Sequence, residues 1–254
     1  MKKIALITGA TAGIGEATAA KFAQNGYDLI LTGRRKELLD KVSRHLCDKY
    51  GIEILPLCFD VRNLQEVEQH LGQLPTKWQA VDVLVNNAGL AVGLNSVQEG
   101  IIDDWERMID TNIKGLLYVT RTIAPLMIKR QQGHIFNIGS IAGKEVYVNG
   151  NVYCATKHAV DALSKAMRMD MLPHNIRVTQ ICPGAAETEF STVRFKGDQQ
   201  RADNVYKGYE PLLAEDIANV IYFVTAMPPH VNINDLVIMP TAQANTTVWH
   251  KKNV

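Results

Sequence analysis

Long apolar runs and paired cysteines are both missing from the sequence. No stretch approaches the roughly 18 apolar residues of a membrane span, and the apolar run near the N-terminus is shorter than the roughly 7–15 residues of a signal-peptide core. The four cysteines form no Cys-x2-Cys pair and no cluster, so they indicate reduced thiols rather than disulfides or a zinc site. We therefore expect a cytoplasmic protein with no membrane segment and no bound metal.

Charge of one sign is also scarce. The chain has 27 Lys and Arg residues against 26 Asp and Glu, a formal net charge of +1, and no block of like charge. Broad electrostatic binding to nucleic acid or to an anionic membrane is therefore not expected, which leaves a small molecule as the expected partner. Hydrophobic residues make up 46% and charged residues 21%, the balance of a globular chain. Because the 254 residues show no break in composition and no repeat, we expect one domain, residues 1–254.

Short apolar runs alternate with segments of helical periodicity along the chain. The expected strands are residues 3–8, 28–32, 53–59, 81–85, 134–138, 176–181 and 235–239. The expected helices are residues 14–25, 35–50, 64–74, 103–130 with a bend before Pro125, 152–172 and 213–226. The strand runs are continuously apolar, so both faces of their sheet are covered. This pattern predicts an α/β fold of the Rossmann type, a doubly wound parallel sheet with helices on both faces.

A glycine-rich turn follows the first expected strand. The turn contains Gly9, Thr11, Gly13, Ile14 and Gly15, with the spacing Gly-x3-Gly-x-Gly. The first glycine allows a tight turn, the second lets the backbone approach a pyrophosphate, and the third lets helix and strand pack closely. The helix start that follows offers unpaired N–H groups to the phosphates. An ordinary turn can also hold three glycines, but the place between a strand and a helix favours a dinucleotide site.

The end of the second expected strand carries arginines where many dinucleotide sites carry an acid. An Asp or Glu usually holds the adenosine ribose there, but this chain has Gly33, Arg34 and Arg35. Guanidinium groups suit the multidentate recognition of a phosphate, so Arg34 and Arg35 favour NADP(H) over NAD(H). The alternative is that the two arginines only begin a solvated helix.

Asp60 and Val61 stand at the end of the third expected strand. In a dinucleotide site the Asp60 carboxylate can accept a hydrogen bond from the adenine amino group. Asp60 can equally cap the helix expected to begin near Leu64. The sequence alone leaves both interpretations open.

Polar residues follow the fourth and fifth expected strands and continue into the next helix. Asn87 lies at the end of the fourth strand, Asn112 lies in the following helix, and Ser140 ends the fifth strand. Tyr153 and Lys157 are four residues apart, so they share one helical face. A nearby ammonium favours the phenolate and makes a tyrosine a usable acid or base, and Ser140 can donate to a carbonyl oxygen beside it. A lone Tyr-x3-Lys pair is more often plain helix-surface packing.

Taken together, these motifs resemble the short-chain dehydrogenase/reductase family over essentially the whole chain. The matching motifs are Thr8-Gly-x3-Gly-Ile-Gly15, Asp60-Val61, Asn86-Asn-Ala-Gly89, Asn112, Ser140, Tyr153-x3-Lys157 and Pro183-Gly184-x3-Thr188. The resemblance implies a sheet of about seven parallel strands and hydride transfer with a nicotinamide cofactor.

The same resemblance implies a role for each catalytic candidate. Tyr153 would be the acid/base, and Lys157 would bind the nicotinamide ribose and lower the pKa of the tyrosine. Ser140 would orient the substrate, and Asn112 would hold a water in a proton relay. The resemblance also implies cofactor contacts from Asn87, Ala88, Gly89, Pro183, Gly184 and Thr188.

Several further segments resemble a narrower group, the NADP-dependent serine/3-hydroxy acid dehydrogenases. They are Thr32-Gly-Arg-Arg35, Leu74-Pro75-x2-Trp78, Thr188-Glu-Phe-Ser191, Val193-Arg-Phe-Lys-Gly-Asp198 and Pro229-His-Val-Asn-Ile-Asn234. This likeness implies small 3-hydroxy or 3-oxo acids as substrates, such as serine, L-allo-threonine or 3-hydroxypropionate. It also implies a cytosolic homotetramer.

The polar stretch 184–210 lacks clear periodicity and suggests a lid over the nicotinamide. A substrate carboxylate needs a fixed cation other than Lys157, and this stretch supplies Arg194 and Lys196. Arg194 is the better candidate because a guanidinium can grip a carboxylate with two hydrogen bonds. Alternatively, Arg194 is a solvated loop charge or pairs with Glu187 or Glu189 to order the lid.

Two other functions compete with a 3-hydroxy acid dehydrogenase. One is a reductase of bulkier carbonyls, such as 3-oxoacyl thioesters, sugars or xenobiotic ketones. The other is a catalytically silent protein that senses NADP(H) by binding it. The presence of Ser140, Tyr153 and Lys157 together argues against a silent protein.

Overall fold

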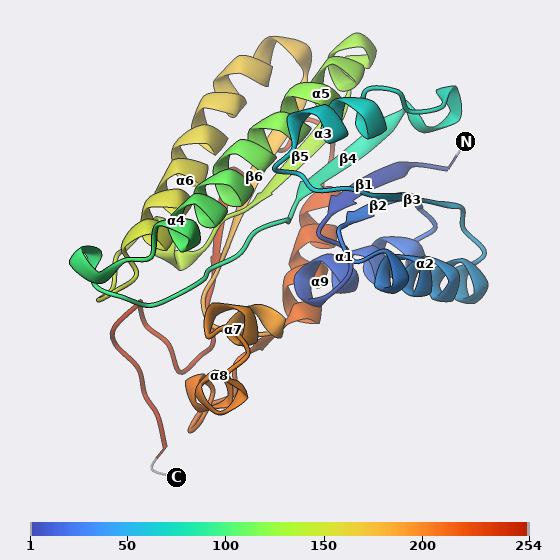
Figure 1. Cartoon of the computed structure of the whole chain (residues 1–254). Helices are drawn as coiled ribbons and strands as arrows, with labels where there is room; N and C mark the ends of the chain where they lie inside the picture. The colour runs from blue at the N-terminus through green and yellow to red at the C-terminus, as the bar shows by residue number, and fades with distance from the viewer. Residues whose placement is uncertain (1, 253–254) are drawn as a thin grey trace.

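A computed structural model gives the fold and describes residues 2–252. Seven parallel strands form the main sheet in the order β3-β2-β1-β4-β5-β6-β9, visible at the centre of Figure 1. The strands are β1 Ile4–Thr8, β2 Asp28–Gly33, β3 Ile54–Cys58, β4 Val81–Asn86, β5 Gly133–Ile138, β6 Ile176–Pro183 and β9 Asp235–Ile238. The strand order reverses between β1 and β4, and such a switch point opens a crevice at the carboxyl ends of the strands.

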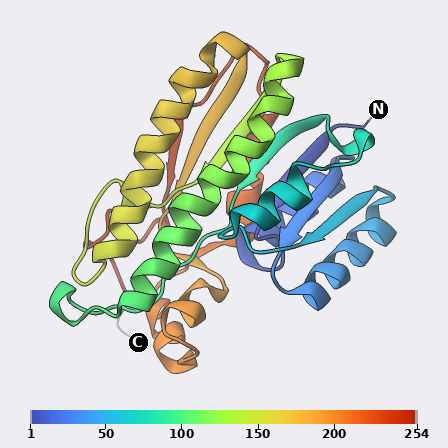
Figure 2. The same ribbon diagram turned by 45° about the horizontal axis from the view of Figure 1, so that its top comes forward.

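Helices cover both faces of this sheet (Figure 2). One face carries α1 (Gly13–Gln24), α2 (Lys36–Tyr50) and α9 (Ala214–Thr225), and the other carries α3 (Leu64–Leu71), α4 (Ile102–Ile109), α5 (Leu116–Arg130) and α6 (Asn151–Met171). Phe22 and Ile221 are buried in the core of the first face, and Ile123 and Val160 in that of the second. All residues of β1 and β2 are buried, because these strands lie between two apolar layers. The predicted doubly wound α/β fold is confirmed.

The long helix expected over residues 103–130 is instead three pieces. Between α4 and α5 the backbone takes a π-helical turn over Asp110–Gly115, and α5 runs without interruption past Pro125. The helix is therefore not interrupted at Pro125, and the irregularity lies directly before α5, whereas the expected bend before Pro125 stays a prediction. Single π turns are rare and often occur at functional sites, and this one carries Asn112.

The segment 184–210 is more ordered than its sequence pattern indicates. It contains β7 (Ala186–Glu187), α7 (Glu189–Arg194) and α8 (Gln199–Val205), and β7 pairs in parallel with β8 (Leu212–Leu213). The Thr188 hydroxyl caps α7 by accepting a hydrogen bond from the Phe190 N–H, and Asp198 caps α8 in the same way. Figure 1 shows α7 and α8 beyond the carboxyl ends of the strands, beside the C-terminal segment.

Short 3-10 turns complete the connections between these elements. They are Thr76–Trp78, Val97–Glu99, Ile141–Gly143 and Leu172–His174. Among the described helices, none is both long and apolar enough to cross a membrane.

Candidate active site

A cavity of about 700 Å³ opens at the switch point, beyond the carboxyl ends of the central strands. The glycine turn and the arginines after β2 line one end, and Ser140, Tyr153 and Lys157 line the other. The segment 184–210 adds Thr188, Arg194 and neighbouring residues to the wall. Residues predicted from separate motifs therefore meet around one space of the size typical of a ligand site.

The glycine turn has the geometry that its sequence predicts. Gly9 and Gly13 have φ angles of +66° and +54°, which favour glycine. A side chain on Gly15 would place its Cβ 2.3 Å from the Gly9 carbonyl oxygen, so the third glycine is needed for close packing. The Asn87 amide donates hydrogen bonds to the carbonyl oxygens of Thr8 and Gly9, at 2.9 and 3.2 Å. Asn87 thus braces the turn, a contact that its place after β4 did not reveal.

Arg34 and Arg35 both line the cavity, and each has an acidic neighbour. The Arg34 guanidinium lies 3.6 Å from the Asp60 carboxylate. Arg35 donates to the Thr11 hydroxyl at 3.1 Å and to Glu189 Oε2 at 2.9 Å. Arg35 therefore bridges the glycine turn and α7, and is more than a solvated residue at a helix start. The sequence analysis considered Glu189 only as a possible partner of Arg194, whereas the structure pairs it with Arg35.

Asp60 lines the cavity with Val61, but it does not cap α3. The cap is Asn63, whose side chain accepts hydrogen bonds from the N–H groups of Gln65 and Glu66. The capping alternative for Asp60 is therefore wrong. Arg62 donates two side-chain hydrogen bonds to Asp60 Oδ2, at 2.7 and 2.9 Å. Burial raises the pKa of Asp60, but the Arg62 hydrogen bonds and the charges of Arg62 and Arg34 outweigh burial and hold that pKa below its usual range.

Tyr153 and Lys157 project from α6 toward Ser140, which follows β5. Both side chains are buried, and the Lys157 ammonium donates to the Ile138 carbonyl oxygen at 2.9 Å. Burial lowers the pKa of Lys157 to about 8. Burial also raises the pKa of Tyr153, while the charge of Arg194 and a hydrogen bond with Ser140 oppose that rise. Two cationic groups therefore lie near the phenol ring, with the Arg194 guanidinium carbon 5.0 Å and the Lys157 ammonium 5.9 Å from its centre.

Asn112 lies behind the cavity wall rather than in it. Its Oδ1 accepts from the Leu90 N–H at 2.9 Å, and its Nδ2 donates to the Leu90 carbonyl oxygen at 2.9 Å and to the Thr156 hydroxyl at 3.0 Å. These bonds tie the π-helical turn to the loop after β4 and to α6. The proton-relay role of Asn112 stays a prediction.

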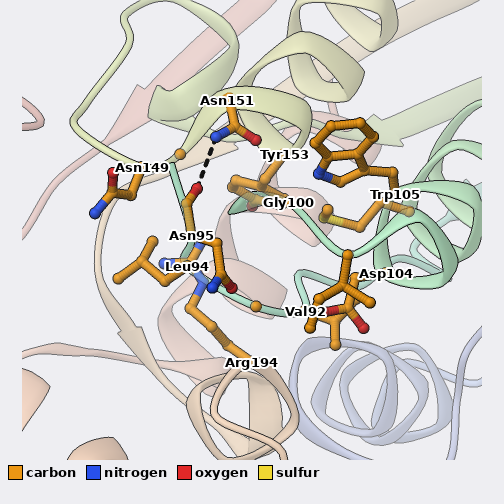
Figure 3. Close-up of a pocket in the computed structure, with 14 residues that line it drawn as sticks. Val92, Leu94, Asn95, Gly100, Asp104, Trp105, Asn149, Asn151, Tyr153 and Arg194 are labelled. Carbon is orange, nitrogen blue, oxygen red and sulfur yellow. Dashed lines mark hydrogen bonds between the residues drawn. The ribbon is translucent and has the colours of Figure 1, made fainter. Parts of the chain in front are cut away.

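Arg194, at the end of α7, lies directly over the catalytic candidates. Its guanidinium carbon is 5.0 Å from the centre of the Tyr153 ring and 5.2 Å from that of Phe190. Its Nη2 donates to the Tyr147 hydroxyl at 2.5 Å, and its Nε is buried without a hydrogen-bond partner. Figure 3 shows Arg194 and Tyr153 on the wall of one small pocket.

The ion pair considered as an alternative for Arg194 does not form. Glu189 pairs with Arg35, and Arg194 forms no ion pair with Glu187 or Glu189 in the part of the chain that the structure describes. Tyr147, which holds Arg194, was missed because an isolated tyrosine in a loop carries no pattern. Three C-terminal residues that line the cavity were also missed, because they belong to no recognisable sequence motif. They are Gln243, Thr246 and Trp249.

Most of the remaining predicted cofactor residues also lie on the cavity, whereas Gly15 does not line it. Those that line it are Gly9, Thr11, Gly13, Ile14, Asn87, Ala88, Gly89, Pro183, Gly184 and Thr188. The helix α1 begins at Gly13 without a side-chain cap, so its first N–H groups are available to a phosphate. A phosphate-binding turn, two arginines and a buried Tyr–Lys pair along one cavity fit a phosphorylated dinucleotide cofactor.

Residues 3–199 match the short chain dehydrogenase family. The chain belongs to this family, and the match covers most of its length. The fold and the Ser140–Tyr153–Lys157 arrangement agree with this assignment.

Individual relatives of the chain have more specific descriptions than the family as a whole. The chain is 47% identical over 242 residues to an NADP-dependent 3-hydroxy acid dehydrogenase of Escherichia coli strain K12, covering 95% of this chain and 96% of that protein. It is 43% identical over 251 residues to a protein of the same description from Schizosaccharomyces pombe, covering 98% and 97%. A solved structure of serine dehydrogenase in a closed form with NADP+ superposes with a TM-score of 0.91 at 45% identity, covering 98% of this chain and all of that one.

The protein is therefore an NADP-dependent oxidoreductase that acts on CH–OH groups. The cofactor predicted from Arg34 and Arg35 agrees with these relatives. The comparisons also decide against the alternative of a catalytically silent binding protein.

Proposed function

We propose that the protein transfers a hydride between NADP(H) and a small 3-hydroxy or 3-oxo acid, of the serine, L-allo-threonine or 3-hydroxypropionate class. The observation that carries this proposal is the Arg194 guanidinium over the Tyr153 ring, with a buried Nε that has no partner. A carboxylate attached one carbon from the reacting carbinol would supply that partner. The names of the relatives, 3-hydroxy acid and serine dehydrogenases, support the same substrate class.

Each side chain around the cavity has its own role in the proposed reaction. When bound, NADP supplies the carbon that accepts or donates the hydride. Tyr153 takes the hydroxyl proton during oxidation and returns it during reduction, and the Ser140 hydroxyl donates to the same substrate oxygen. Lys157 holds the nicotinamide ribose, and Asn112 supports a water in the proton path. Arg194 favours the phenolate form of Tyr153 by its charge, in addition to binding the carboxylate.

The cofactor residues act at the other end of the cavity. Arg34 and Arg35 bind the 2′-phosphate, the N-terminus of α1 binds the pyrophosphate, and Asp60 and Val61 contact the adenine. The turn from Pro183 to Thr188 lines the nicotinamide, together with the Asn87-Ala88-Gly89 segment. Residues 184–210 form a lid within the single domain, with α7 as its inner surface.

A bulkier carbonyl substrate is the weaker alternative. A charged guanidinium over the acid/base disfavours a large apolar ketone, because the charge would be buried without a partner. The carboxylate of a small acid removes that cost by forming a charge-assisted pair.

We also propose a homotetramer in the cytoplasm. Phe223 on α9 and Val237 on β9 are large apolar side chains left about half exposed at one edge of the sheet, where a second subunit can cover them. All four cysteines are free thiols, which suits a reducing compartment.

The substrate proposal is tested by Arg194→Ala, assayed with 3-hydroxypropionate and with its amide, a neutral molecule of the same shape. Loss of a charged hydrogen-bond pair worth up to about 3 kcal/mol should lower kcat/KM on the acid by about 10²-fold. The amide should be affected far less. Arg201→Ala is the matched control, since Arg201 is an exposed arginine of α8 away from the cavity. An equal loss on both substrates would show that Arg194 orders the lid without reading the carboxylate.

A further inference from the structure

A buried carboxylate lies beside the substrate end of the cavity, and its partner comes from the lid. Asp104, in the first turn of α4, is only 3% exposed. Its Oδ2 lies 2.8 Å from the ammonium of Lys196, two residues after Arg194, in an ion pair that lacks hydrogen-bond geometry. The other cation near Asp104 is Arg107 on the same helix, at 3.9 Å from Oδ1. Lys196 is thus the closest positive charge to a carboxylate that is almost completely removed from water.

The backbone near Asp104, at Gly93, and the backbone of Lys196 itself both take unusual conformations beside this ion pair. Gly93 has a φ of +74°, and a Cβ there would lie 2.8 Å from Asp104 Oδ2. The Gly93 N–H donates to the Arg194 carbonyl oxygen at 3.0 Å, which joins the loop after β4 to the end of α7. Lys196 itself has a φ of +55°, a conformation that a non-glycine residue seldom adopts without compensating contacts.

These contacts surround the pocket in which Arg194 meets Tyr153. Asp104, Tyr153 and Arg194 line that pocket (Figure 3). Gly93 lines it as well. The Asp104–Lys196 pair therefore fixes the end of α7 against α4, and the Arg194 guanidinium is the last side chain of α7 before that fixed point.

We propose that Asp104 is a positioning residue for substrate specificity: through Lys196 it holds Arg194 over Tyr153, in the place where Arg194 binds the substrate carboxylate. This inference rests on the proposed function, because it gives Asp104 a role only through the carboxylate contact of Arg194. Asp104 touches neither the substrate nor the cofactor in this account.

The Asp104–Lys196 ion pair also makes the position of the lid depend on whether the Asp104 carboxylate has a compensating positive charge. When α7 lies against α4, the Lys196 ammonium compensates the buried Asp104 carboxylate. Removing one partner of a buried pair leaves the other uncompensated, which costs more than removing both. The lysine variant should therefore be more damaging than the double variant, an order that simple loss of packing does not produce.

The first experiment compares Asp104→Asn with Asp103→Asn. The Asp103 side chain is the exposed neighbour in the same turn, so its variant is the matched control. For Asp104→Asn we expect the KM for 3-hydroxypropionate to rise about tenfold, the effect of weakening one charged contact by roughly 1.4 kcal/mol. The Kd for NADP should stay within about a factor of two of wild type. The kcat and the kcat/KM for the amide, which lose only the effect of the Arg194 charge on Tyr153, should fall much less than the kcat/KM for the acid.

The second experiment is a double-mutant cycle with Lys196→Met. The KM for the acid should be highest in Lys196→Met and should fall when Asp104→Asn is added, because the uncompensated carboxylate is then gone. In an Arg194→Ala background, Asp104→Asn should cause no further rise in KM for the acid. Thermal unfolding and NADP binding of each variant establish that the protein is folded.

The outcomes separate this inference from the proposed function. If Arg194→Ala is selective for the acid but Asp104→Asn leaves the KM unchanged, the positioning role is wrong and the substrate proposal stands. Equal losses on acid and amide in Asp104→Asn, or strictly additive effects of Asp104→Asn and Lys196→Met, would also overturn the positioning role. If Arg194→Ala harms acid and amide equally, the substrate proposal itself fails.

Discussion

At the residue scale, two cations flank one phenol in the site. Lys157 lies below Tyr153 on the same helix, bonded to the Ile138 carbonyl oxygen, and Arg194 reaches the ring from α7. Both charges are held in a buried setting, where electrostatic effects are stronger than in water. The pKa of the acid/base therefore depends on a lid residue as well as on its helix neighbour.

Tyr153→Phe tests the acid/base assignment with the smallest change. It removes only the hydroxyl, so the fold and NADP binding should survive. General acid–base catalysis contributes typically about 10²–10⁴-fold, and kcat should fall by that factor. Pre-steady-state turnover with saturating NADP measures the effect. Turnover near the wild-type value would mean that another group moves the proton.

Lys157 should leave a signature in stability against pH. Its pKa in the folded protein is about 8, below the usual 10.5, so the unfolded chain binds more protons between these values. The wild type should therefore gain stability relative to Lys157→Met as the pH rises from 8 to 10.5. The gain is about 3 kcal/mol in all, at 1.36 kcal/mol for each pKa unit.

Urea unfolding without cofactor, for wild type and Lys157→Met at matched pH values, measures this difference. The comparison between the two proteins cancels the other groups that titrate in the same range. A difference that is flat across the range, or that shrinks as the pH rises, would show that Lys157 is not buried as a charged group.

At the scale of elements, strands and motif positions could be predicted from the sequence, whereas the lid contacts could not. Continuous apolar runs gave the seven strands within a few residues, because buried parallel strands need them. The turn at Asp110–Gly115 was missed because a single π turn adds only about one residue to the helical repeat, a shift too small to read from apolar spacing. The helices α7 and α8 were missed because they are shorter than the window in which periodicity can be read.

The residues of the candidate site also differ in whether the sequence could predict them. Residues fixed to strand ends or to one helical face, such as Ser140, Tyr153 and Lys157, were placed by the topology itself. Contacts between elements far apart in the chain, such as Arg35 with Glu189 and Asp104 with Lys196, depend on side-chain geometry and have no local pattern.

The connection between β2 and α2 should determine the choice of cofactor. Arg34→Ala combined with Arg35→Ala removes the charges proposed to bind the 2′-phosphate, each worth about 1.5–3 kcal/mol. We expect kcat/KM with NADP to fall by at least about tenfold, and the value with NAD to change little. Arg44→Ala, an exposed arginine on the outer part of α2, is the control. A parallel loss with both cofactors would indicate damage to the fold of the connection.

At the scale of the whole molecule, one cavity joins the end proposed to bind the cofactor phosphates to the end proposed to bind the substrate acid. The sheet supplies the rigid side through the ends of its central strands, and the segment 184–210 closes the other side. The segment is fixed at two places, through Arg35 at the cofactor end and through Asp104 at the substrate end. The proposed cofactor residue Arg35 and the proposed substrate residue Arg194 are therefore both linked to the same small element, α7.

The enzyme uses NADP, and we propose that it recognises the carboxylate of a small 3-hydroxy acid. The most direct test is the steady-state kcat/KM of the wild-type enzyme on 3-hydroxypropionate and its amide, with NADP and with NAD. We predict a value about 10²-fold higher for the acid than for the amide, and at least about tenfold higher with NADP than with NAD. Equal efficiency on the acid and the amide, or with the two cofactors, would contradict the account.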